Sequence, residues 1–306
     1  MRVLVTGAGG FVARHVIAAL RERDHVPIAA YHHRAVGASV DSAVFSVDDP
    51  VGALSAIRKA KPEAIVNCAA YGVDYRQQDI ALAVAVNVLG PAQLFSAARD
   101  AGVSRFVQVG TGYEYGSHDA RISEDSDCVP VGTYGATKAA GSVILMELGR
   151  RAEPAPVLVR PFSMYGPGEV ASKLVRQILD AAVTGADLDL TEGRDIRDYM
   201  PVADVARAIA AMTTIAESRF PYGGVFNICS GRSTTVREFA QAVSSAAGGT
   251  GGLRFGALPP RTNPLLQVVG DPSRWRSFCE ENGIAEVLSE TPMAAVISQM
   301  IEERHR

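Results

Sequence analysis

Tyr134 and Lys138 have the types and spacing best suited to chemistry, four positions apart in the stretch TYGATK. An unperturbed tyrosine has a pKa of about 10, so it needs a nearby cation to exchange protons close to neutral pH. Helical spacing would place the lysine ammonium beside the phenol. Such a pair could move a proton to or from a carbonyl oxygen, which complements hydride transfer at the attached carbon. Alone, the stretch is more typical of a solvated helical pair, so the chemistry requires a cofactor site elsewhere.

A glycine-rich stretch near the N-terminus, TGAGGFVA, could form that cofactor site. Gly7 and Gly10 stand three apart, with Ala13 where a third small residue is expected. Glycine permits positive φ and lets the backbone approach a pyrophosphate. A helix beginning near Phe11 and Val12 would offer free N–H groups to the phosphates. Because a strand-like run precedes it and a helical pattern follows, the stretch predicts a dinucleotide site rather than a turn without a ligand.

The end of the second predicted strand indicates which dinucleotide binds. An acidic residue there would bind the ribose 2′-hydroxyl and repel a 2′-phosphate. The sequence reads AAYHHRAV, with no carboxylate until Asp41. Arg34 could pair with a 2′-phosphate, although an ordinary surface arginine is the alternative. The stretch therefore favours NADP(H), with NAD(H) as the alternative.

Apolar runs at 2–6, 25–31, 43–47, 63–70, 105–111 and 155–162 predict strands, and helical spacing separates several of them. Most lack polar alternation, which indicates a parallel sheet covered on both faces. Right-handed crossovers then give a doubly wound α/β fold of the Rossmann type. The second half is less regular and predicts a smaller mixed α/β lobe over the carboxyl ends of the strands. In it, Thr234 or Thr235 with Glu238 could form a capping box.

The domain boundaries follow from this pattern. We expect residues 1–165, with 196–228 returning, to form mainly the Rossmann domain. We expect residues 166–195 and 229–306 to form mainly the substrate-binding lobe.

Composition excludes several classes of protein. A net charge of -3 and a pI of about 6.1 argue against non-specific nucleic-acid binding. The 4 cysteines lie far apart without a CxxC, so neither a metal site nor a disulfide framework is predicted. Glycines appear within a few residues of the N-terminus, which argues against a signal peptide. We found no apolar run long enough for a membrane span and expect a cytoplasmic protein.

Several motifs occur together in a fixed order: TGAGGFVA, NCAA, Asn87, TGYEYG, YGATK, RPFSMYGPG and RDIRDYMPVADVARAI. In this set and order, the sequence resembles the extended short-chain dehydrogenases/reductases. It is most similar to the branch acting on nucleotide sugars, which contains epimerases, dehydratases and 4-ketoreductases. The resemblance covers nearly the whole chain and is weakest after Thr235.

The resemblance implies roles for individual residues. Tyr134 resembles the catalytic tyrosine, Lys138 the lysine that binds the nicotinamide ribose and lowers the tyrosine pKa, and Thr111 the hydroxyl that binds the substrate oxygen. Asp48 resembles an adenine-contacting acid, with a turn or helix cap as the alternative. The implied cofactor-binding set is Gly7, Gly10, Phe11, Val12, Arg34, Asp48, Ala69, Ala70, Asn87, Tyr134, Lys138 and Pro161.

The resemblance also implies a nucleotide-diphosphate sugar as substrate. Ser163 stands where relatives usually have an asparagine. Arg197 and Arg261 match positions that clamp the diphosphate, and a surface salt bridge, such as Arg197 with Asp195, is the alternative. The implied substrate-binding set is Tyr71, Thr111, Gly112, Tyr113, Ser163, Arg197 and Arg261.

The residues after Thr111 separate the reactions of this branch. Dehydratases carry an acid pair there, whereas this sequence has Gly112 and Tyr113. Glu114 should face the other way if the strand continues. A 4,6-dehydratase is therefore disfavoured, and no added Cys/Lys pair suggests 3,5-epimerisation.

Two reactions then remain. One is reduction of the 4-keto group of a nucleotide-activated 6-deoxy sugar by NADPH, which the HHR stretch favours; the other is NAD-dependent 4-epimerisation. A non-catalytic NADP sensor and a reductase of another carbonyl compound are further alternatives. The resemblance suggests a homodimer packed through helices at 78–100 and 134–150.

Overall fold

A seven-stranded sheet forms the centre of the molecule, in the order β11-β6-β5-β4-β1-β2-β3. All its neighbouring strands are parallel. The computed structural model describes the chain except residues 33–40, 75, 153, 249–250, 261–264 and 305–306. The strands are β1 (Arg2–Thr6), β2 (Val26–Tyr31), β3 (Asp41–Val44), β4 (Ala64–Asn67), β5 (Arg105–Val109), β6 (Val157–Pro161) and β11 (Val225–Ile228). The doubly wound parallel sheet expected from the sequence is confirmed.

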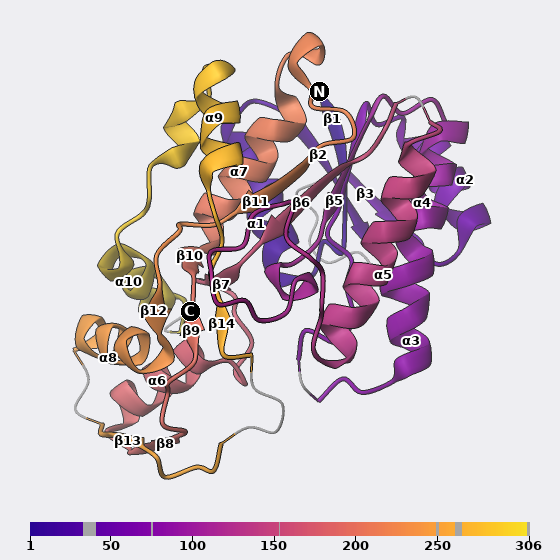
Figure 1. Ribbon diagram of the computed structural model, residues 1–306. Coiled ribbons are helices and arrows are strands. Elements are labelled where there is room, and N and C mark those ends of the chain that lie inside the picture. The colour runs from indigo at the N-terminus through magenta and orange to yellow at the C-terminus, as the bar shows by residue number, and fades with distance from the viewer. Residues whose placement is uncertain (33–40, 75, 153, 249–250, 261–264, 305–306) are drawn as a thin grey trace.

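Helices cover both faces of this sheet (Figure 1). On one face lie α1 (Phe11–Glu22), α7 (Val202–Thr214) and α9 (Ser273–Glu281). On the other lie α2 (Pro50–Ala60), α4 (Gly90–Asp100) and α5 (Gly132–Gly149). A short helix α3 (Ile80–Val84) runs into α4 through a π-helical turn, η1 (Ala85–Leu89).

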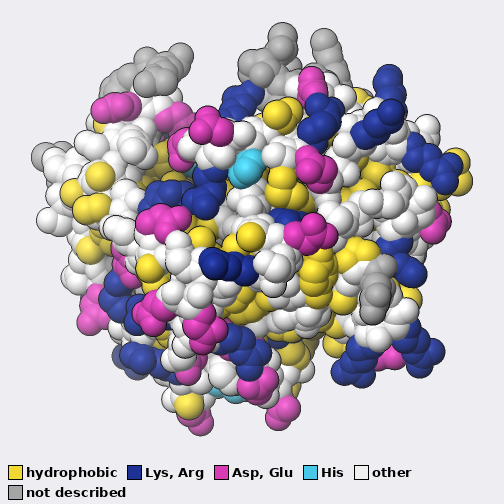
Figure 2. All heavy atoms as spheres, turned by 90° about the horizontal axis from the view of Figure 1, so that it is seen from above, with side chains coloured by type: hydrophobic (Ala, Val, Ile, Leu, Met, Phe, Trp, Pro, Cys, Tyr) yellow, Lys and Arg dark blue, Asp and Glu magenta, His cyan; other side chains and the backbone are white. Residues whose placement is uncertain are grey.

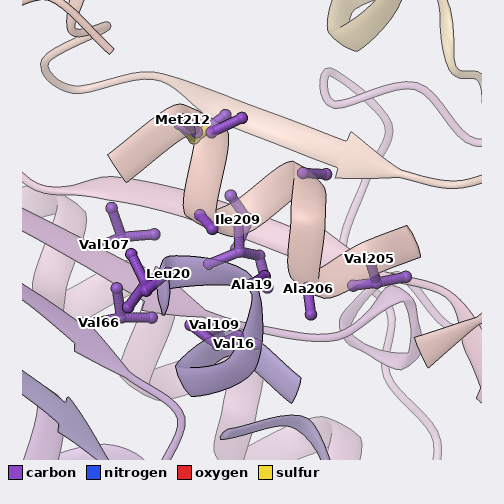
Figure 3. Packing of buried hydrophobic residues seen from close by; sticks show 14 of the residues in the cluster. Val16, Ala19, Leu20, Val66, Val107, Val109, Val205, Ala206, Ile209 and Met212 are labelled. Carbon is purple, nitrogen blue, oxygen red and sulfur yellow. The ribbon is translucent and has the colours of Figure 1, made fainter. Parts of the chain in front are cut away.

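The face beneath α1 and α7 shows why these segments form helices. Val16 and Leu20 recur at helical spacing on α1, and both are fully buried. Figure 3 shows them lying between Val66 and Val107 of the sheet and Ile209 of α7. The apolar stripe of α1 is thus covered on two sides, which anchors the helix whose first turn follows the glycine loop.

A smaller lobe lies beside the carboxyl ends of the strands (Figure 1). Its helices are α6 (Leu174–Thr184), α8 (Val236–Ala247) and α10 (Met293–Arg304), which enclose a core of their own. Its short strands are β7 (Ser163–Tyr165), β8 (Leu188–Leu190), β9 (Ile196–Arg197), β10 (Tyr199–Pro201), β12 (Thr234–Thr235), β13 (Leu253–Phe255) and β14 (Gln267–Val268). They pair as β7 with β10, β8 with β13, and β12-β9-β14, in which β12 is antiparallel to β9. The expected mixed α/β lobe is confirmed.

The chain crosses between sheet and lobe more than once. Within 196–228, α7 packs on the large sheet and β11 is one of its strands, whereas β9 pairs with strands of the lobe. Within 229–306, Trp275 and Cys279 of α9 are buried in the core beneath the large sheet. Residues from both halves of the sequence therefore meet at the carboxyl ends of the strands.

The stretch Ile80–Asp100 corrects one expectation from the sequence. Among the described residues, it is the one helical run long and apolar enough to cross a membrane, by length and composition only. Leu94 and Phe95 on this run are buried in the core of the sheet. A buried core helix has the same composition as a spanning helix, so this finding is weak evidence for a span.

Charges of both signs are mixed on the surface. Figure 2 shows Lys and Arg side chains interspersed with Asp and Glu on the face seen from above the view of Figure 1. This face therefore lacks a field of a single sign, among its described side chains, that would attract a polyanion.

Candidate active site

The glycine loop lies where the strand order of the sheet reverses, between β1 and β4. Folds of this kind bind ligands in the crevice at such a switch point. Gly7 has a φ of +64°, and a Cβ there would lie 3.1 Å from the Cα of Ala69. The Gly10 N–H donates to the Gly7 carbonyl at 2.7 Å, and Gly10 is the N-cap of α1. The structure thus brings the loop, the first turn of α1 and the end of β4 together.

The first turn of α1 begins with Phe11 and Val12, as expected from the sequence. A Cβ at Gly9 would meet nothing within 4 Å, so the loop leaves space beside the helix N-terminus. This cradle fits a pyrophosphate, because the backbone N–H groups of a helix N-terminus bind anions. The described residues contain no group of three His, Cys, Asp or Glu arranged to hold a metal ion.

Asn87 connects the loop after β4 to α5 through its side-chain amide. Its Oδ1 accepts from the Tyr71 N–H at 2.9 Å. Its Nδ2 donates to the Tyr71 carbonyl at 2.8 Å and to Oγ1 of Thr137 at 2.9 Å. The side chain therefore ties the loop after β4 to α5, and both hydrogens of its amide are donated within the protein. It lies in the π-helical turn η1, a feature often found at functional sites.

Thr111, Tyr134 and Lys138 meet at the carboxyl end of β5. Tyr134 lies in the first turn of α5, and the Thr111 side chain lies close enough to its phenol to lower the pKa of the phenol. Lys138 is 2% exposed and donates from Nζ to the Val109 carbonyl at 2.7 Å. The proton donor, the hydroxyl and the cation assigned from the sequence are thus brought into one site.

The pKa of Tyr134 differs from the expectation that Lys138 lowers it. Burial raises this pKa, the carboxylate of Glu114 raises it further, and the hydrogen bond from Thr111 lowers it only in part. Burial also lowers the pKa of Lys138, against the attraction of Glu114. Because burial disfavours both charged forms, the Tyr134 phenol remains protonated at neutral pH.

Glu114 does not point outward, which corrects an expectation from the sequence. The strand ends at Val109, and a 3₁₀ turn over Gly112–Glu114 follows. Glu114 is fully buried: its Oε1 accepts from the Thr111 N–H at 2.9 Å, and its Oε2 accepts from Nε of Arg160 at 2.8 Å. The predicted strand at 105–111 extends too far, although the Thr-x-x-Glu pattern of a capping box is present at 111–114.

The turn also explains the glycine after Thr111. A Cβ at Gly112 would lie 3.0 Å from the ring of Phe162. A dehydratase-type aspartate at this position would therefore collide with the buried ring. With Gly112 lacking a carboxyl group and Glu114 occupied by Arg160, the turn offers no free acid to the substrate side.

Tyr113 is the centre of a polar cluster on the substrate side. The side chains of Ser163, Arg197 and Lys173 lie close enough to its phenol to act on its pKa. Burial is the largest influence and raises the pKa of Tyr113, but these neighbours together outweigh it, so the pKa is lowered. The resemblance assigned Tyr113, Ser163 and Arg197 to substrate binding and missed Lys173, whose Nζ donates to the Val73 carbonyl at 2.8 Å.

Arg197 makes the ion pair with Asp195 that the sequence gave as the alternative to a diphosphate clamp, and the clamp stays a prediction. Its side chain is 8% exposed and pairs with Asp195 at 3.4 Å. Its Nη1 donates to the Ile196 carbonyl at 2.8 Å, and the guanidinium also reaches Tyr113. The ion pair with Asp195 therefore holds the guanidinium beside the polar cluster.

The remaining assigned residues are placed as follows. Asp48 lies beyond β3, which ends at Val44, and its carboxylate accepts from the Ser46 hydroxyl. Ala70 is exposed after β4, and Pro161 is buried at the end of β6. Arg34 and Arg261 lie outside the described residues.

Comparison with known proteins agrees with this geometry. Residues 3–229 match the model of the NAD dependent epimerase/dehydratase family. The chain is 31% identical to a UDP-glucose 4-epimerase of Mycolicibacterium smegmatis, over 90% of this chain and 91% of that protein. It is 29% identical to a dTDP-4-dehydrorhamnose reductase of Streptomyces griseus, over 90% of this chain and 79% of that protein.

A solved structure shares the whole fold. The UDP-glucose 4-epimerase of Thermus thermophilus, in complex with NAD, matches with a TM-score of 0.85 and 26% identity. The match covers 100% of this chain and 99% of that chain.

A doubly wound sheet with a glycine loop at its switch point and a Tyr–Lys helix beside it defines an NAD(P)-dependent short-chain dehydrogenase/reductase. The chain belongs to the NAD-dependent epimerase/dehydratase family, in the extended branch of that class. This confirms the resemblance seen in the motifs. Since one relative is named an epimerase and another a reductase, the similarity alone does not separate the two reactions.

Proposed function

We propose that this enzyme uses NADPH to reduce the 4-keto group of a nucleotide-activated 6-deoxy sugar. The observation that carries the proposal is the contact between the protonated Tyr134 phenol and Thr111 at the carboxyl end of β5. NADPH, when bound, supplies the hydride. Tyr134 then donates its proton to the oxygen of the former carbonyl, and the Thr111 hydroxyl orients that oxygen.

The protonated state of the Tyr134 phenol suits the proton donor of a carbonyl reduction. Burial and the Glu114 carboxylate both favour the protonated form. Gly112 and the buried Glu114 further support simple carbonyl reduction, since they leave the turn without the acids that eliminate water.

The substrate end of the site favours a diphosphate. Arg197 and Lys173 lie beside Tyr113, and Ser163 completes the cluster. Guanidinium and ammonium groups bind phosphate oxygens with charge-assisted hydrogen bonds. We propose that this cluster binds the nucleotide diphosphate and the adjoining sugar hydroxyls.

The second candidate is a 4-epimerase with bound NAD. Its support is the 31% identity to a UDP-glucose 4-epimerase and the fold shared with an NAD complex of such an enzyme. The two reactions differ in cofactor balance, because epimerisation leaves the cofactor unchanged over a full cycle. Assaying nucleotide sugars and their 4-keto derivatives with NADPH and NADH separately distinguishes them.

Arg34→Ala tests the cofactor proposal. We expect the Kd for NADPH to rise on the order of tenfold or more, because a charge-assisted contact to the 2′-phosphate is lost. The Kd for NADH should hardly change. Fluorescence titration of both cofactors measures the effect, with Arg58→Ala on the exposed side of α2 as the control. Equal weakening of NADPH and NADH would contradict the NADP(H) assignment.

We propose that the enzyme is a homodimer packed through the helices at 78–100 and 134–150. Several large apolar side chains are exposed on these helices: Ile80, Leu82, Val84, Leu89, Val143, Ile144 and Leu148. Apolar surface gathered on adjacent helices is typical of an interface. An interface on these helices also accounts for the apolar composition of the run Ile80–Asp100.

Val143→Glu tests the dimer. Val143 is 64% exposed on α5, so we expect the substitution to leave the fold intact and to dissociate the dimer. Light scattering coupled to size-exclusion chromatography measures the mass. Val183→Glu, at a 53% exposed position on α6, is the control and should remain dimeric. A wild-type chain that is monomeric at all concentrations tested would rule the proposal out.

A further inference from the structure

The carboxylate of Glu114 and the guanidinium of Arg160 form a buried ion pair directly behind the proposed active site. Their side chains are 0% and 8% exposed, and Oε2 of Glu114 lies 2.8 Å from Nε of Arg160. Burying two charges is costly unless each is paired and further hydrogen-bonded. Along β6 the positions on either side of Arg160 are the apolar Val159 and Pro161, so the strand itself does not call for a charge there. The pair therefore needs a reason beyond stability.

The first clue is what Glu114 holds with its other oxygen. Oε1 accepts from the backbone N–H of Thr111 at 2.9 Å. In return, Oγ1 of Thr111 accepts from the Tyr113 N–H at 3.3 Å, which completes a capping box. Since this bond uses the Thr111 hydroxyl as an acceptor, its own proton is directed away from the turn. The hydroxyl is then available to the nearby Tyr134 phenol, whose pKa it lowers.

The second clue is how firmly Arg160 is fixed. Its guanidinium lies 4.4 Å from the centre of the Tyr115 ring. The Tyr115 hydroxyl donates to Oδ1 of Asn227 at 2.9 Å, and Nδ2 of Asn227 donates to the Ile122 carbonyl at 2.9 Å. Arg160 is thus part of a buried network anchored on β6 and β11. A carboxylate held by such a network has little freedom to move.

The third clue is electrostatic. Glu114 acts on the protonation of both Tyr134 and Lys138: its charge raises the pKa of each. The other titratable groups facing this set are Tyr113, Cys68, Tyr115 and Cys128. Burial raises the pKa of Cys68 and of Tyr115 to about 12 each, so both are neutral near pH 7. The Glu114 carboxylate, paired with Arg160, therefore places a negative charge beside the proton donor.

We propose that Glu114 is a positioning residue. Arg160 holds the Glu114 carboxylate in place. The carboxylate in turn fixes the turn that orients the Thr111 hydroxyl toward Tyr134. The inference rests on the proposed function, because it assumes that Tyr134 is the proton donor. It goes beyond that function by assigning the residue that prepares the donor. Glu114 itself does not touch the substrate.

Glu114→Gln tests this proposal. Glutamine keeps the shape but loses the charge by which Arg160 holds the side chain, and with it the turn that carries Thr111, in place. We expect kcat to fall at least about tenfold with little change in KM, since the misplaced hydroxyl affects the transition state more than binding. In the reduction direction, activity falls as pH rises through the pKa of Tyr134. Removing the anion lowers that pKa, so the alkaline limb of the pH profile should move to lower pH.

The chain offers a matched control in its other capping box. Glu238 accepts from the Thr235 N–H at 2.9 Å at the start of α8, in the smaller lobe. Glu238→Gln should leave both kcat and the pH profile unchanged. If Glu114→Gln does not fold, Glu114→Gln/Arg160→Met removes both charges at similar side-chain volume, which buried pairs often tolerate. It should show the same direction of change.

The outcomes separate this inference from the function on which it rests. Suppose that the folded Glu114 variant keeps the wild-type kcat and an unmoved alkaline limb, while Tyr134→Phe is inactive. The positioning role is then overturned, and the proposed function is left intact. A lowered melting temperature without a shifted limb also overturns it, because that is a purely structural effect. An active Tyr134→Phe overturns the function itself. The assay follows NADPH oxidation, or 4-epimerisation if that is the activity observed.

Discussion

Tyr134→Phe is expected to lower kcat by about 10²–10⁴-fold, the usual contribution of a positioned proton donor. The substitution removes one oxygen atom and leaves the ring in the first turn of α5. The phosphate-binding cradle at Gly7 and Gly10 is untouched. Cofactor binding should therefore stay within about twofold of the wild type, as measured by fluorescence titration, while steady-state turnover collapses.

A second tyrosine provides the control for this substitution. Tyr222 is exposed, and its hydroxyl makes only a long contact of 3.4 Å to the Ser104 carbonyl, at the opposite end of the sheet from the site. Tyr222→Phe should keep wild-type turnover. If Tyr134→Phe also kept it, the proton donor would have to be another group, and the role of Thr111 would fall with it.

Gly141→Ala has the second large expected effect, on stability. Gly141 lies on α5 two turns after Tyr134, where the helix packs on the π-helical turn η1. A Cβ there would lie 1.9 Å from the carbonyl oxygen of Asn87, which is far inside contact distance. Separating α5 from η1 should cost about 1–3 kcal/mol in the free energy of unfolding. We expect the melting temperature to fall by at least roughly 3 °C.

The same substitution should also disturb the site. Asn87 donates to Oγ1 of Thr137 at 2.9 Å, one turn from Tyr134, so a displaced helix moves the proton donor. Turnover should fall together with stability. Ala140→Ser, at the exposed neighbouring position, is the control and should change neither quantity. An unchanged melting curve for Gly141→Ala would contradict the close packing of α5 on η1.

The large sheet could be predicted because its strands are buried on both faces. Runs such as 2–6 and 63–70 are apolar without alternation, and the glycines after β1 mark the turn into α1. The capping box of α8 was also predictable, because Thr235 and Glu238 interact through local backbone groups. Local geometry and continuous burial leave clear signals in a sequence.

The turn after β5 shows where such signals fail. Nothing in the alternation of 105–111 announces that the strand ends at Val109, and its early end reverses the direction of Glu114. The partner of Glu114 is Arg160, which belongs to another strand and is brought near only by the order of the sheet. A buried charge pair between distant residues therefore could not be predicted from one sequence.

The polar cluster on the substrate side depended on the resemblance in a similar way. The motifs assigned Tyr113, Ser163 and Arg197 one by one, but their mutual contacts require β9 and β7 to lie beside the turn after β5. Lys173 carries no motif and was missed. Asn87, which the resemblance assigned to the cofactor, is bonded to Tyr71 and Thr137 within the protein, and its cofactor role stays a prediction.

The most direct test of the proposed function is a turnover assay with a 4-keto-6-deoxy nucleotide sugar, following both the reduced cofactor and the sugar product. We predict net oxidation of NADPH with one equivalent of 4-hydroxy product formed, and slower reaction with NADH. The reductase would be contradicted if the 4-keto compounds did not oxidise NADPH and the enzyme instead interconverted C4 epimers without net change in the cofactor. That result would establish the epimerase.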